Sequence, residues 1–431
     1  MRQHLNREKC AFTCEMIDFL ISPLRQHSSS KVPGYHGIQG RMQIIDDIPI
    51  WGSPDEGAVR QIKTCAKSAD RVALMADHHK GYAVPIGGVV AYRDSISPSG
   101  VGFDIACGNK AVLLDMPGSS LRANIGRIMD DVWKTISFGV GRRNAERVDH
   151  ALFESKAWKC EAAAPLKEMA RQQLGTVGSG NHYVDLFTDE EDRVWIGVHF
   201  GSRGLGHKIA TWFLKKAGAA DGMDVEPCVI AAESDLGEQY IQCMQLGGEY
   251  AYAGRDWVCE RVADLLGARI LEEVHNHHNF AWRETHGGEE LWVVRKGATP
   301  AFPGQKGFVG GTMGETSVIL EGVENDEAKY SMYSTVHGAG RVMGRMEAKG
   351  KVDKKTGEVK RAGRVTKEMM EGWLQKANVE LRGAGLDESP DCYKRLPEVL
   401  AEHGKSIRIL HTLTPVGVAM AGADEFDPYK D

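Results

Sequence analysis

Short apolar runs separated by turn residues dominate the chain from Met42 onward. Three of them are MQIIDDIPIWG, VALMADHHKGYAVPIGGVVAY and GVGFDIACGNKAVLLDMPG, each interrupted by Gly or Pro. This pattern is typical of buried strands joined by tight connections. The same pattern returns in RVWIGVHFGSRGLG, LWVVRKGAT, FVGGTMGETSVIL and the segment around His337. We expect strands and glycine-rich loops in all of these places.

Helical patterns occupy three other stretches. Residues 120–174 contain few glycines, and residues 367–382 follow a helical pattern. A long helix is expected over 255–275, where apolar residues recur at helical spacing: Val258, Val262, Leu265, Leu266 and Ile270. Strands and helices in mixed order, without regular alternation, predict an α+β fold of mixed, largely antiparallel sheets flanked by helices. We expect one large catalytic domain over residues 41–431, preceded by a peripheral segment, residues 1–40.

The composition is that of an ordinary soluble protein. The chain has 431 residues, of which 42% are hydrophobic and 26% are charged. Its nine cysteines are scattered without repeated spacing, which argues against a disulfide scaffold. No apolar run approaches the ~20 residues that cross a bilayer, and the N-terminus lacks a secretory layout. We therefore expect a cytoplasmic protein that does not associate with membranes.

The charge balance excludes a protein that coats nucleic acid indiscriminately. The formal net charge is −6, whereas such binding depends on cations that neutralise phosphates. A local site remains allowed, because one basic stretch follows His337 directly: Arg345, Lys349, Lys351, Lys354, Lys355, Lys360, Arg361 and Arg364. A charge run is usually a solvated loop, but its place beside His337 favours contact with a phosphate backbone.

His337 lies in the segment STVHGAGRVMGR, among residues that are almost all small. Gly338, Ala339 and Gly340 allow a large ligand to approach the main chain and leave amide N–H groups free for an oxyanion, while Arg341 can pair with phosphate. Such a setting suits a histidine nucleophile. A glycine-rich turn with a surface histidine is the alternative interpretation.

Asp104 and Cys107, in GFDIACGNK, form a candidate metal-binding pair. On a straight strand their side chains would point to opposite faces, so a shared site requires a turn, which the flanking glycines permit. Carboxylate and thiolate together suit a borderline divalent cation. A buried free cysteine beside an N-capping aspartate is the alternative.

Three histidines favour the metal site over this alternative. His182, His199 and His275 stand beside Gly, Asn or Ser and outside any apolar stripe. With Asp104 and Cys107 they suggest a bridged dinuclear site, which suits phosphoryl transfer because two cations neutralise both the attacking and the leaving oxygen. A separate zinc pair on the predicted helix, formed by His275 and His278, is the alternative.

Eight motifs occur in an order that resembles the RtcB family of RNA-splicing ligases: DHHKGYAVPIGGVVA, GVGFDIACG, GSGNHYVD, HFGSRGLG, VHN, RKGATPAFP, GTMGETS and HGAGR. The resemblance implies an enzyme that depends on GTP and on two manganese ions. It implies that RNA 2′,3′-cyclic phosphate or 3′-phosphate ends are joined to 5′-hydroxyl ends, in RNA repair or tRNA splicing. Some relatives act with an archease-like activator, which is therefore a candidate partner.

The resemblance also implies roles for particular residues. The manganese ligands would be Asp104, Cys107, His182, His199 and His275, with Cys107 as the bridge, and His337 would accept GMP. The guanylate would contact Asn181, His182, Asp185, His275, Asn276, Gly310, Gly311, Thr312, Met313, Ser317, His337, Gly338, Ala339 and Gly340. Relatives contact guanine with a C-terminal lysine, but Met420 and Ala421 stand near that place here. Lys430, in the C-terminal tail, is the candidate replacement.

Two other function classes remain open from the sequence. One is a manganese-dependent phosphoesterase or an enzyme that caps the 3′-phosphate ends of RNA or DNA by guanylyl transfer without efficient joining. The other is a non-catalytic RNA-binding protein, which the presence of His337 together with a full ligand set disfavours. Labelled RNA with a cyclic phosphate end, followed in the presence of GTP and manganese, separates joining from end modification.

Overall fold

A computed structural model describes residues 42–220, 222–352 and 359–423. All of them belong to one compact unit that spans Gly37–Asp431. The peripheral segment expected at residues 1–40 and the tail with Lys430 lie outside the described residues. Among the described helices, none is long and apolar enough to cross a membrane.

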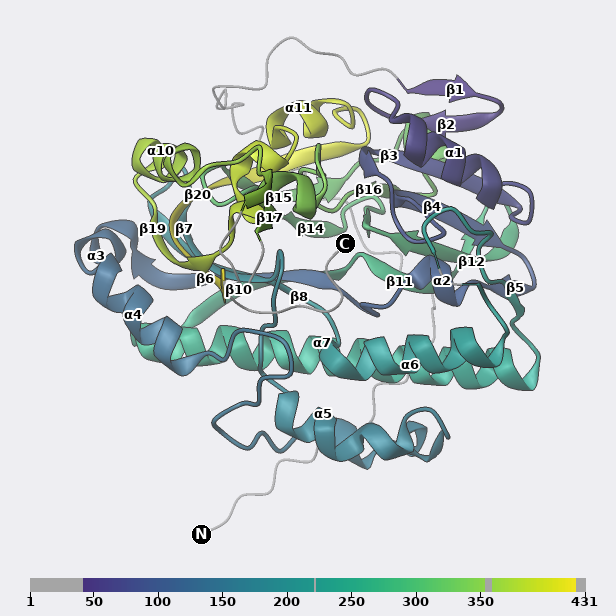
Figure 1. Ribbon diagram of the computed structural model, residues 1–431, viewed down its shortest axis with the longest axis horizontal. Coiled ribbons are helices and arrows are strands. Elements are labelled where there is room, and N and C mark those ends of the chain that lie inside the picture. The colour runs from purple at the N-terminus through teal and green to yellow at the C-terminus, as the bar shows by residue number, and fades with distance from the viewer. Residues whose placement is uncertain (1–41, 221, 353–358, 424–431) are drawn as a thin grey trace, which may run out of the picture. The chain divides into compact units, whose positions relative to one another are not determined.

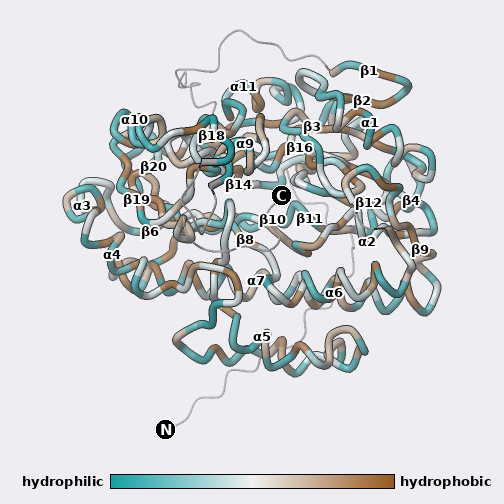
Figure 2. Tube along the Cα trace, in the orientation of Figure 1, coloured by the Kyte–Doolittle hydropathy of each residue, from teal (hydrophilic) through white to brown (hydrophobic). Residues whose placement is uncertain are grey.

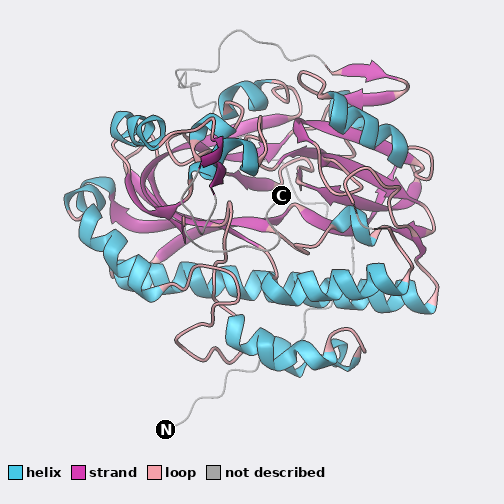
Figure 3. Cartoon of the chain, in the orientation of Figure 1, coloured by secondary structure: helices cyan, strands magenta, loops and turns pink. Residues whose placement is uncertain are grey.

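Two largely antiparallel sheets carry the fold, and helices flank them (Figures 1 and 3). The smaller sheet has the order β1-β2-β3-β4-β12-β11. Its strands are β1 (Gln43–Ile45), β2 (Ile48–Ile50), β3 (Arg71–His79), β4 (Ile86–Tyr92), β11 (Asn279–His286) and β12 (Glu289–Lys296). The larger sheet has the order β10-β6-β8-β7-β20-β15-β14, with β19 beside β20. Its strands are β6 (Gly108–Pro117), β7 (Tyr183–Thr188), β8 (Arg193–Phe200), β10 (Ile270–His277), β14 (Lys306–Val309), β15 (Ser317–Gly322), β19 (Glu380–Ala384) and β20 (Ile407–Gly422).

Short strand pairs form separate two-stranded sheets. These are β5 (Ser95–Ile96) with β9 (Ile230–Ala231), β13 (Ala298–Pro300) with β16 (Ser334–Val336), and β17 (Gly350–Val352) with β18 (Val359–Ala362). Within the described ranges only β2/β3 and β19/β20 pair in parallel. The expected α+β class with largely antiparallel sheets is therefore confirmed.

The α-helices are α1 (Glu56–Cys65), α2 (Pro98–Val101), α3 (Gly118–Ala123), α4 (Ile125–Thr135), α5 (Lys167–Gln173), α6 (Arg203–Lys216), α7 (Asp235–Leu266), α8 (Asp326–Tyr330), α9 (Arg345–Lys349), α10 (Lys367–Ala377) and α11 (Leu396–Ala401). Short 3-10 turns lie at Ala151–Glu154, Lys156–Lys159, Ala164–Leu166, Leu386–Glu388 and Pro390–Cys392. The helical pattern over 120–174 is thus several short helices and turns.

The helix expected over 255–275 is wrong at both ends. Helix α7 begins at Asp235, where Ser234 caps it by accepting a hydrogen bond from the Gly237 amide. It ends at Leu266, because Gly267 follows in the left-handed conformation. Residues 270–277 then form β10 instead of continuing the helix. The helix expected over 367–382 also ends early, at Ala377, and is followed by β19.

Alternation along the strands of the larger sheet creates two different faces. Val184 and Val198 point to the face packed against α4 and α7, whereas Tyr183 and Trp195 point to the other. Polar residues with the same alternation as Tyr183, such as Asp185 on β7, therefore share the face away from α7. In Figure 2 teal and brown residues are interspersed along the strands and helices, as expected for elements with one apolar face.

Candidate active site

A cavity of about 630 Å³ gathers segments that are far apart in the sequence. Its lining includes Asp104, Cys107, Asn181, His182, Tyr183, Asp185, His199, His278, Asn279, Gly310, Gly311, Thr312, Met313, His337, Gly338, Ala339 and Gly340. Most candidate residues thus meet in one place. His275, Asn276 and Ser317 do not line the cavity, and Lys430 lies outside the described residues.

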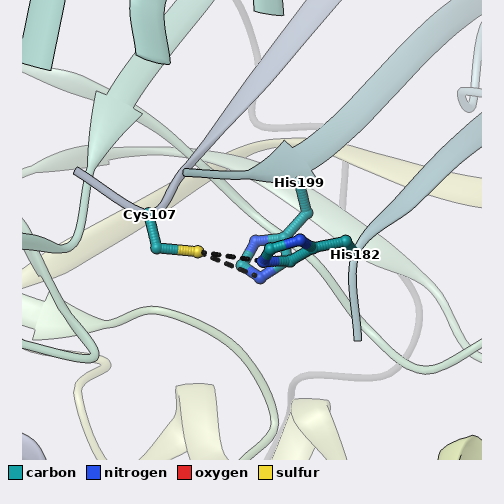
Figure 4. A group of neighbouring side chains, drawn as sticks. All are labelled: Cys107, His182 and His199. Atoms are coloured by element: carbon teal, nitrogen blue, oxygen red, sulfur yellow. Dashed lines mark hydrogen bonds between the residues drawn. The ribbon is translucent and has the colours of Figure 1, made fainter. Parts of the chain in front are cut away.

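Cys107 lies between two imidazoles (Figure 4). Its Sγ is 3.7 Å from His182 Nε2 and 3.6 Å from His199 Nε2. These three ligand atoms all lie within 4.8 Å of one another, in a geometry that could hold a metal ion. Asp104 adds a carboxylate, whose Oδ2 is 3.1 Å from His182 Nε2. Four of the five candidate ligands are therefore neighbours.

A turn brings Asp104 and Cys107 together, as the sequence requires. The Cys107 amide donates to the Asp104 carbonyl at 3.0 Å, and Ala106 has a positive φ of 60°. Arg255, fully buried on α7, donates from Nη1 to the Ala106 carbonyl at 3.1 Å. This contact holds an uncommon backbone conformation beside Cys107 in place.

Hydrogen bonds on the far side of each ring fix the histidine tautomers. His199 Nδ1 donates to Asn109 Oδ1 at 2.6 Å, and the amide nitrogen of Asn109 donates to the Phe308 carbonyl. His182 Nδ1 donates to the Val177 carbonyl at 3.0 Å. In His199, Nε2 is left facing Cys107 with its lone pair, which is how proteins usually present histidine to a metal. In His182, Nε2 also faces Asp104 and donates to its carboxylate at 3.1 Å, so metal binding there would displace this proton.

Burial and neighbours set the protonation states of this group. Burial alone would raise the pKa of Asp104, but hydrogen bonding to His182 lowers the pKa to about 2. Burial lowers the pKa of His199 well below its usual value, so this ring is neutral. Burial also raises the pKa of the Cys107 thiol well above its usual value. Metal binding would therefore displace a proton from Cys107.

His278, and not His275, faces the cluster. The His278 ring stacks on His199 with centroids 5.1 Å apart and lies 4.8 Å from the ring of His337. His275 turns the other way, toward α7, where its Nε2 accepts from Arg255 Nε at 2.7 Å. Strand alternation explains the difference, because His275 and His277 share the face that contacts Arg255.

The sequence contains the dipeptide His-Asn twice, so it offers two candidates, His275 and His278, for the same position in the site. VHNHHN contains His-Asn at 275–276 and again at 278–279. Asn279 lines the cavity, and its Oδ1 accepts from the Gly297 amide at 2.8 Å. Asn276 instead accepts from the Phe308 amide at 3.1 Å. Strand alternation places His275 with His277 on the face that contacts Arg255 and His278 on the opposite face.

A buried carboxylate that sequence reasoning missed supports His337. Asp77, on β3, has no exposed surface, and its Oδ2 accepts from His337 Nδ1 at 2.6 Å and from the His337 amide at 3.0 Å. Burial alone would raise the pKa of Asp77, but the contact with His337 lowers the pKa instead. Because the carboxylate only accepts, Nδ1 carries a proton, and in the neutral form of the ring the lone pair is on Nε2.

Two polar atoms of the cavity lining, both on β7, have no hydrogen-bond partner among the described residues. They are the buried Asp185 Oδ1 and the buried Tyr183 hydroxyl. Val418 and Met420, on the adjacent strand β20, form apolar wall there. Burial raises the pKa of Asp185 well above its usual value. Buried polar groups seldom stay unpaired, so this part of the cavity is suited to a ligand with hydrogen-bonding edges and an apolar face.

A cysteine and histidine cluster able to hold metal, beside a histidine backed by a buried carboxylate, defines a candidate metal-dependent active site. The family model for the tRNA-splicing ligase RtcB matches residues 58–421. The chain therefore belongs to the RtcB family, as the eight sequence motifs indicated.

Individual relatives agree over most of the chain. The RNA-splicing ligase RtcB of Escherichia coli K12 is 30% identical over 380 residues, covering 80% of this chain and 88% of that protein. The tRNA-splicing ligase RtcB of Thermococcus kodakarensis is 30% identical, covering 80% and 86%. That of Archaeoglobus fulgidus is 28% identical, covering 90% and 94%.

Proposed function

We propose that the protein is an RNA ligase that joins 2′,3′-cyclic phosphate or 3′-phosphate ends to 5′-hydroxyl ends through a GMP–His337 intermediate. The observation that carries the proposal is the arrangement of His337, with Nδ1 held by Asp77 at 2.6 Å and its ring 4.8 Å from that of His278. This arrangement presents a nucleophilic nitrogen beside a group suited to metal. Membership of the RtcB family supports the same reaction.

In the first step, His337 Nε2 attacks the α-phosphorus of GTP. An N–P bond forms, the bond between the α-phosphorus and its bridging oxygen breaks, and pyrophosphate leaves. Asp77 keeps the proton on Nδ1 and stabilises the positive charge that develops on the ring. The small residues Gly338 and Ala339 line the cavity beside His337 and leave room for the nucleotide.

Two transfers complete the reaction. An oxygen of the RNA 3′-phosphate attacks the phosphorus on His337, so that the N–P bond breaks and an RNA–GMP anhydride forms. The 5′-hydroxyl of the second RNA end then attacks the activated RNA phosphate and loses its proton to solvent, and GMP leaves. A cyclic end is first opened by water, which breaks the bond to the 2′ oxygen and leaves a 3′-phosphate.

Cys107, His182, His199 and Asp104 would hold the metal, with His278 in the place predicted for His275. The Asp104 carboxylate is the donor that suits manganese, whereas thiolate and imidazole suit a borderline cation. Two manganese ions per chain, as the family resemblance implied, are part of this proposal. Bound manganese would neutralise charge on the phosphate oxygens. The protein itself orients the two rings, because Asn109 Oδ1 accepts from His199 Nδ1 and the Val177 carbonyl accepts from His182 Nδ1.

Guanine would occupy the part of the cavity that holds Asp185. Burial favours the protonated form of Asp185 in the free protein. If guanine binding displaced that proton, the carboxylate would accept from the two adjacent N–H groups of guanine, whereas adenine offers a donor beside an acceptor. Tyr393, in the cavity lining, offers an aromatic face. Asn181 and Gly310–Met313 line the remaining wall, and Lys430 remains a candidate contact from outside the described residues.

The test follows label from α-labelled GTP onto the protein. The His337→Ala variant should lose covalent labelling while manganese binding, measured by elemental analysis, stays nearly intact. Labelling of the variant at the original rate would refute the assignment of His337. Labelled RNA with a cyclic phosphate end and a 5′-hydroxyl acceptor then decides between joining and end modification: a joined product supports the ligase, and a capped or hydrolysed end alone supports the alternative.

A further inference from the structure

The basic stretch after His337 divides into two groups in the structure. The first group neutralises buried carboxylates. Arg345 pairs with Asp387 at 3.1 Å and also with Glu388, and Lys349 pairs with Asp387 at 2.7 Å. Both carboxylates are nearly fully buried. These cations serve the internal structure of the cavity wall, so the sequence overstates the number of cations available to a partner.

The second group lies on the hairpin formed by β17 and β18. Lys351 and Arg361 are exposed and stand directly opposite each other across the two strands. Like charges at opposed positions destabilise an antiparallel pair, because their side chains share one face about 5 Å apart. Within the described ranges, neither residue forms an ion pair with a carboxylate. An anion bound between them would relieve this repulsion.

The hairpin adjoins the cavity. Arg361 donates to the backbone carbonyl of Met346 on α9, and the neighbouring Arg345 and Glu347 line the cavity. Val342, in the cavity lining, is 55% exposed, and Met346, on α9, is 49% exposed. A nucleic-acid strand carries phosphates, which cations bind, and bases, which apolar side chains contact. Exposed apolar side chains beside Lys351 and Arg361 therefore suit a nucleic-acid strand.

We propose that the β17–β18 hairpin binds the phosphate backbone of the RNA strand whose end enters the cavity. Lys351 and Arg361 hold adjacent phosphates, and Val342 and Met346 contact a base. This inference rests on the proposed function for the identity of the strand as RNA. The binding itself is a separate property of the surface, and it is measured without GTP.

The test uses the Lys351→Glu variant and a labelled single-stranded RNA with a 3′-phosphate. The substitution places opposite charges across the strands, so the hairpin and the fold should be at least as stable as before. RNA affinity, measured by fluorescence anisotropy, should fall about tenfold at moderate salt. The new carboxylate stands opposite Arg361 and would pair with it, so two phosphate contacts are lost. The magnitude of the slope of log affinity against log salt should therefore fall by about 1.4, or about 0.7 for each contact. Labelling of His337 by GTP should not change.

Lys215→Glu on α6 is the matched control, since it makes the same charge change at an exposed position (Figure 1). Equal losses of affinity in the two variants would overturn the proposal, because the effect would then be one of overall charge. Unchanged affinity in Lys351→Glu would overturn it as well. Lys351→Arg, which keeps the positive charge, should bind RNA as tightly as the unaltered protein does. Absence of GTP labelling in the unaltered protein would count against the proposed function alone, because RNA binding is measured without GTP.

Discussion

At the scale of single residues, the site depends on groups whose role is visible only in space. Asp77 stands in the motif DHHKGYAVPIGGVVA, but 260 positions separate it from His337. Nothing in the local pattern distinguishes it from a surface aspartate, whereas in the structure it has no exposed area. A carboxylate this deeply buried is stable only when it is paired, and His337 is its partner.

Replacing Asp77 by Asn tests this role as a positioning residue. The amide keeps the volume but can donate to His337 Nδ1, which favours the tautomer with its proton on Nε2 and removes the nucleophilic lone pair. GTP labelling should fall by about 100-fold or more, and the pH profile of the remaining labelling should shift. Manganese content should not change, because Asp77 is not a candidate ligand. A variant that kept the labelling rate and pH profile of the unaltered protein would contradict the role.

The same scale explains which site residues the sequence predicted. Asp104, Cys107, His182, His199 and His337 each stand in a distinct glycine-rich motif and meet in the cavity. His275 stands three residues from a better-placed histidine, and its assignment depended on whether the segment is a helix or a strand. Once the segment is known to be β10, alternation separates His275 from the face of the cavity. Residue chemistry was therefore predictable, while the choice between adjacent candidates required secondary structure.

At the scale of elements, the error over 255–275 has an identifiable cause. The part of α7 from Arg255 onward has a regular apolar stripe, but the part before Arg255 contains Gly247, Gly248 and Gly254, which lower helix propensity. Those glycines serve close packing: a Cβ at Gly248 would lie 3.0 Å from the ring of Phe280. Tertiary contact thus stabilises a helix that local propensity does not favour. Conversely, Ile270 continues the helical spacing by chance after Gly267 has ended the helix.

The loop after His337 allows a matched comparison of two glycines. Gly340 has a φ of 78°, and a Cβ there would overlap the Asp77 carbonyl. A Cβ at Gly338 would be in ordinary contact, 3.5 Å from the Gly310 carbonyl. Gly340→Ala should therefore destabilise the protein by about 2 kcal/mol or more, through strain and overlap. Gly338→Ala should change stability by less than about 0.5 kcal/mol. Chemical denaturation measures both, and equal effects would contradict the argument.

At the scale of the whole molecule, overall charge and local charge serve different purposes. The net charge of −6 keeps nonspecific attraction to nucleic acid low, while cations gather beside the cavity. Many of these cations are paired internally, as Arg345 is with Asp387. Composition therefore favours local over indiscriminate binding, but the number of accessible cations depends on tertiary pairing that the sequence does not reveal.

Buried histidines also link distant parts of the described unit. His403, which follows α11, is fully buried and stacks on Trp51 with ring centroids 5.3 Å apart. Its Nε2 accepts from the backbone amide of Ala76, next to Asp77, at 3.2 Å. Burial lowers the pKa of His403 to about 4. The ring is therefore neutral in the folded protein near neutral pH, and this neutral form supports the strand that carries Asp77.

This lowered pKa predicts a loss of stability in mild acid. In the unfolded chain His403 binds a proton near pH 6.5, whereas in the folded protein it does so only near pH 4. Between these values the unfolded state holds more protons, so the free energy of unfolding falls as the pH falls through this window. The contribution of His403 is roughly 2 kcal/mol between neutral pH and about pH 5. In His403→Gln, which keeps an acceptor for the Ala76 amide but does not titrate, urea denaturation of metal-free protein should show a pH dependence smaller by that amount. An unchanged pH dependence would mean that His403 is protonated at the same pH in both states.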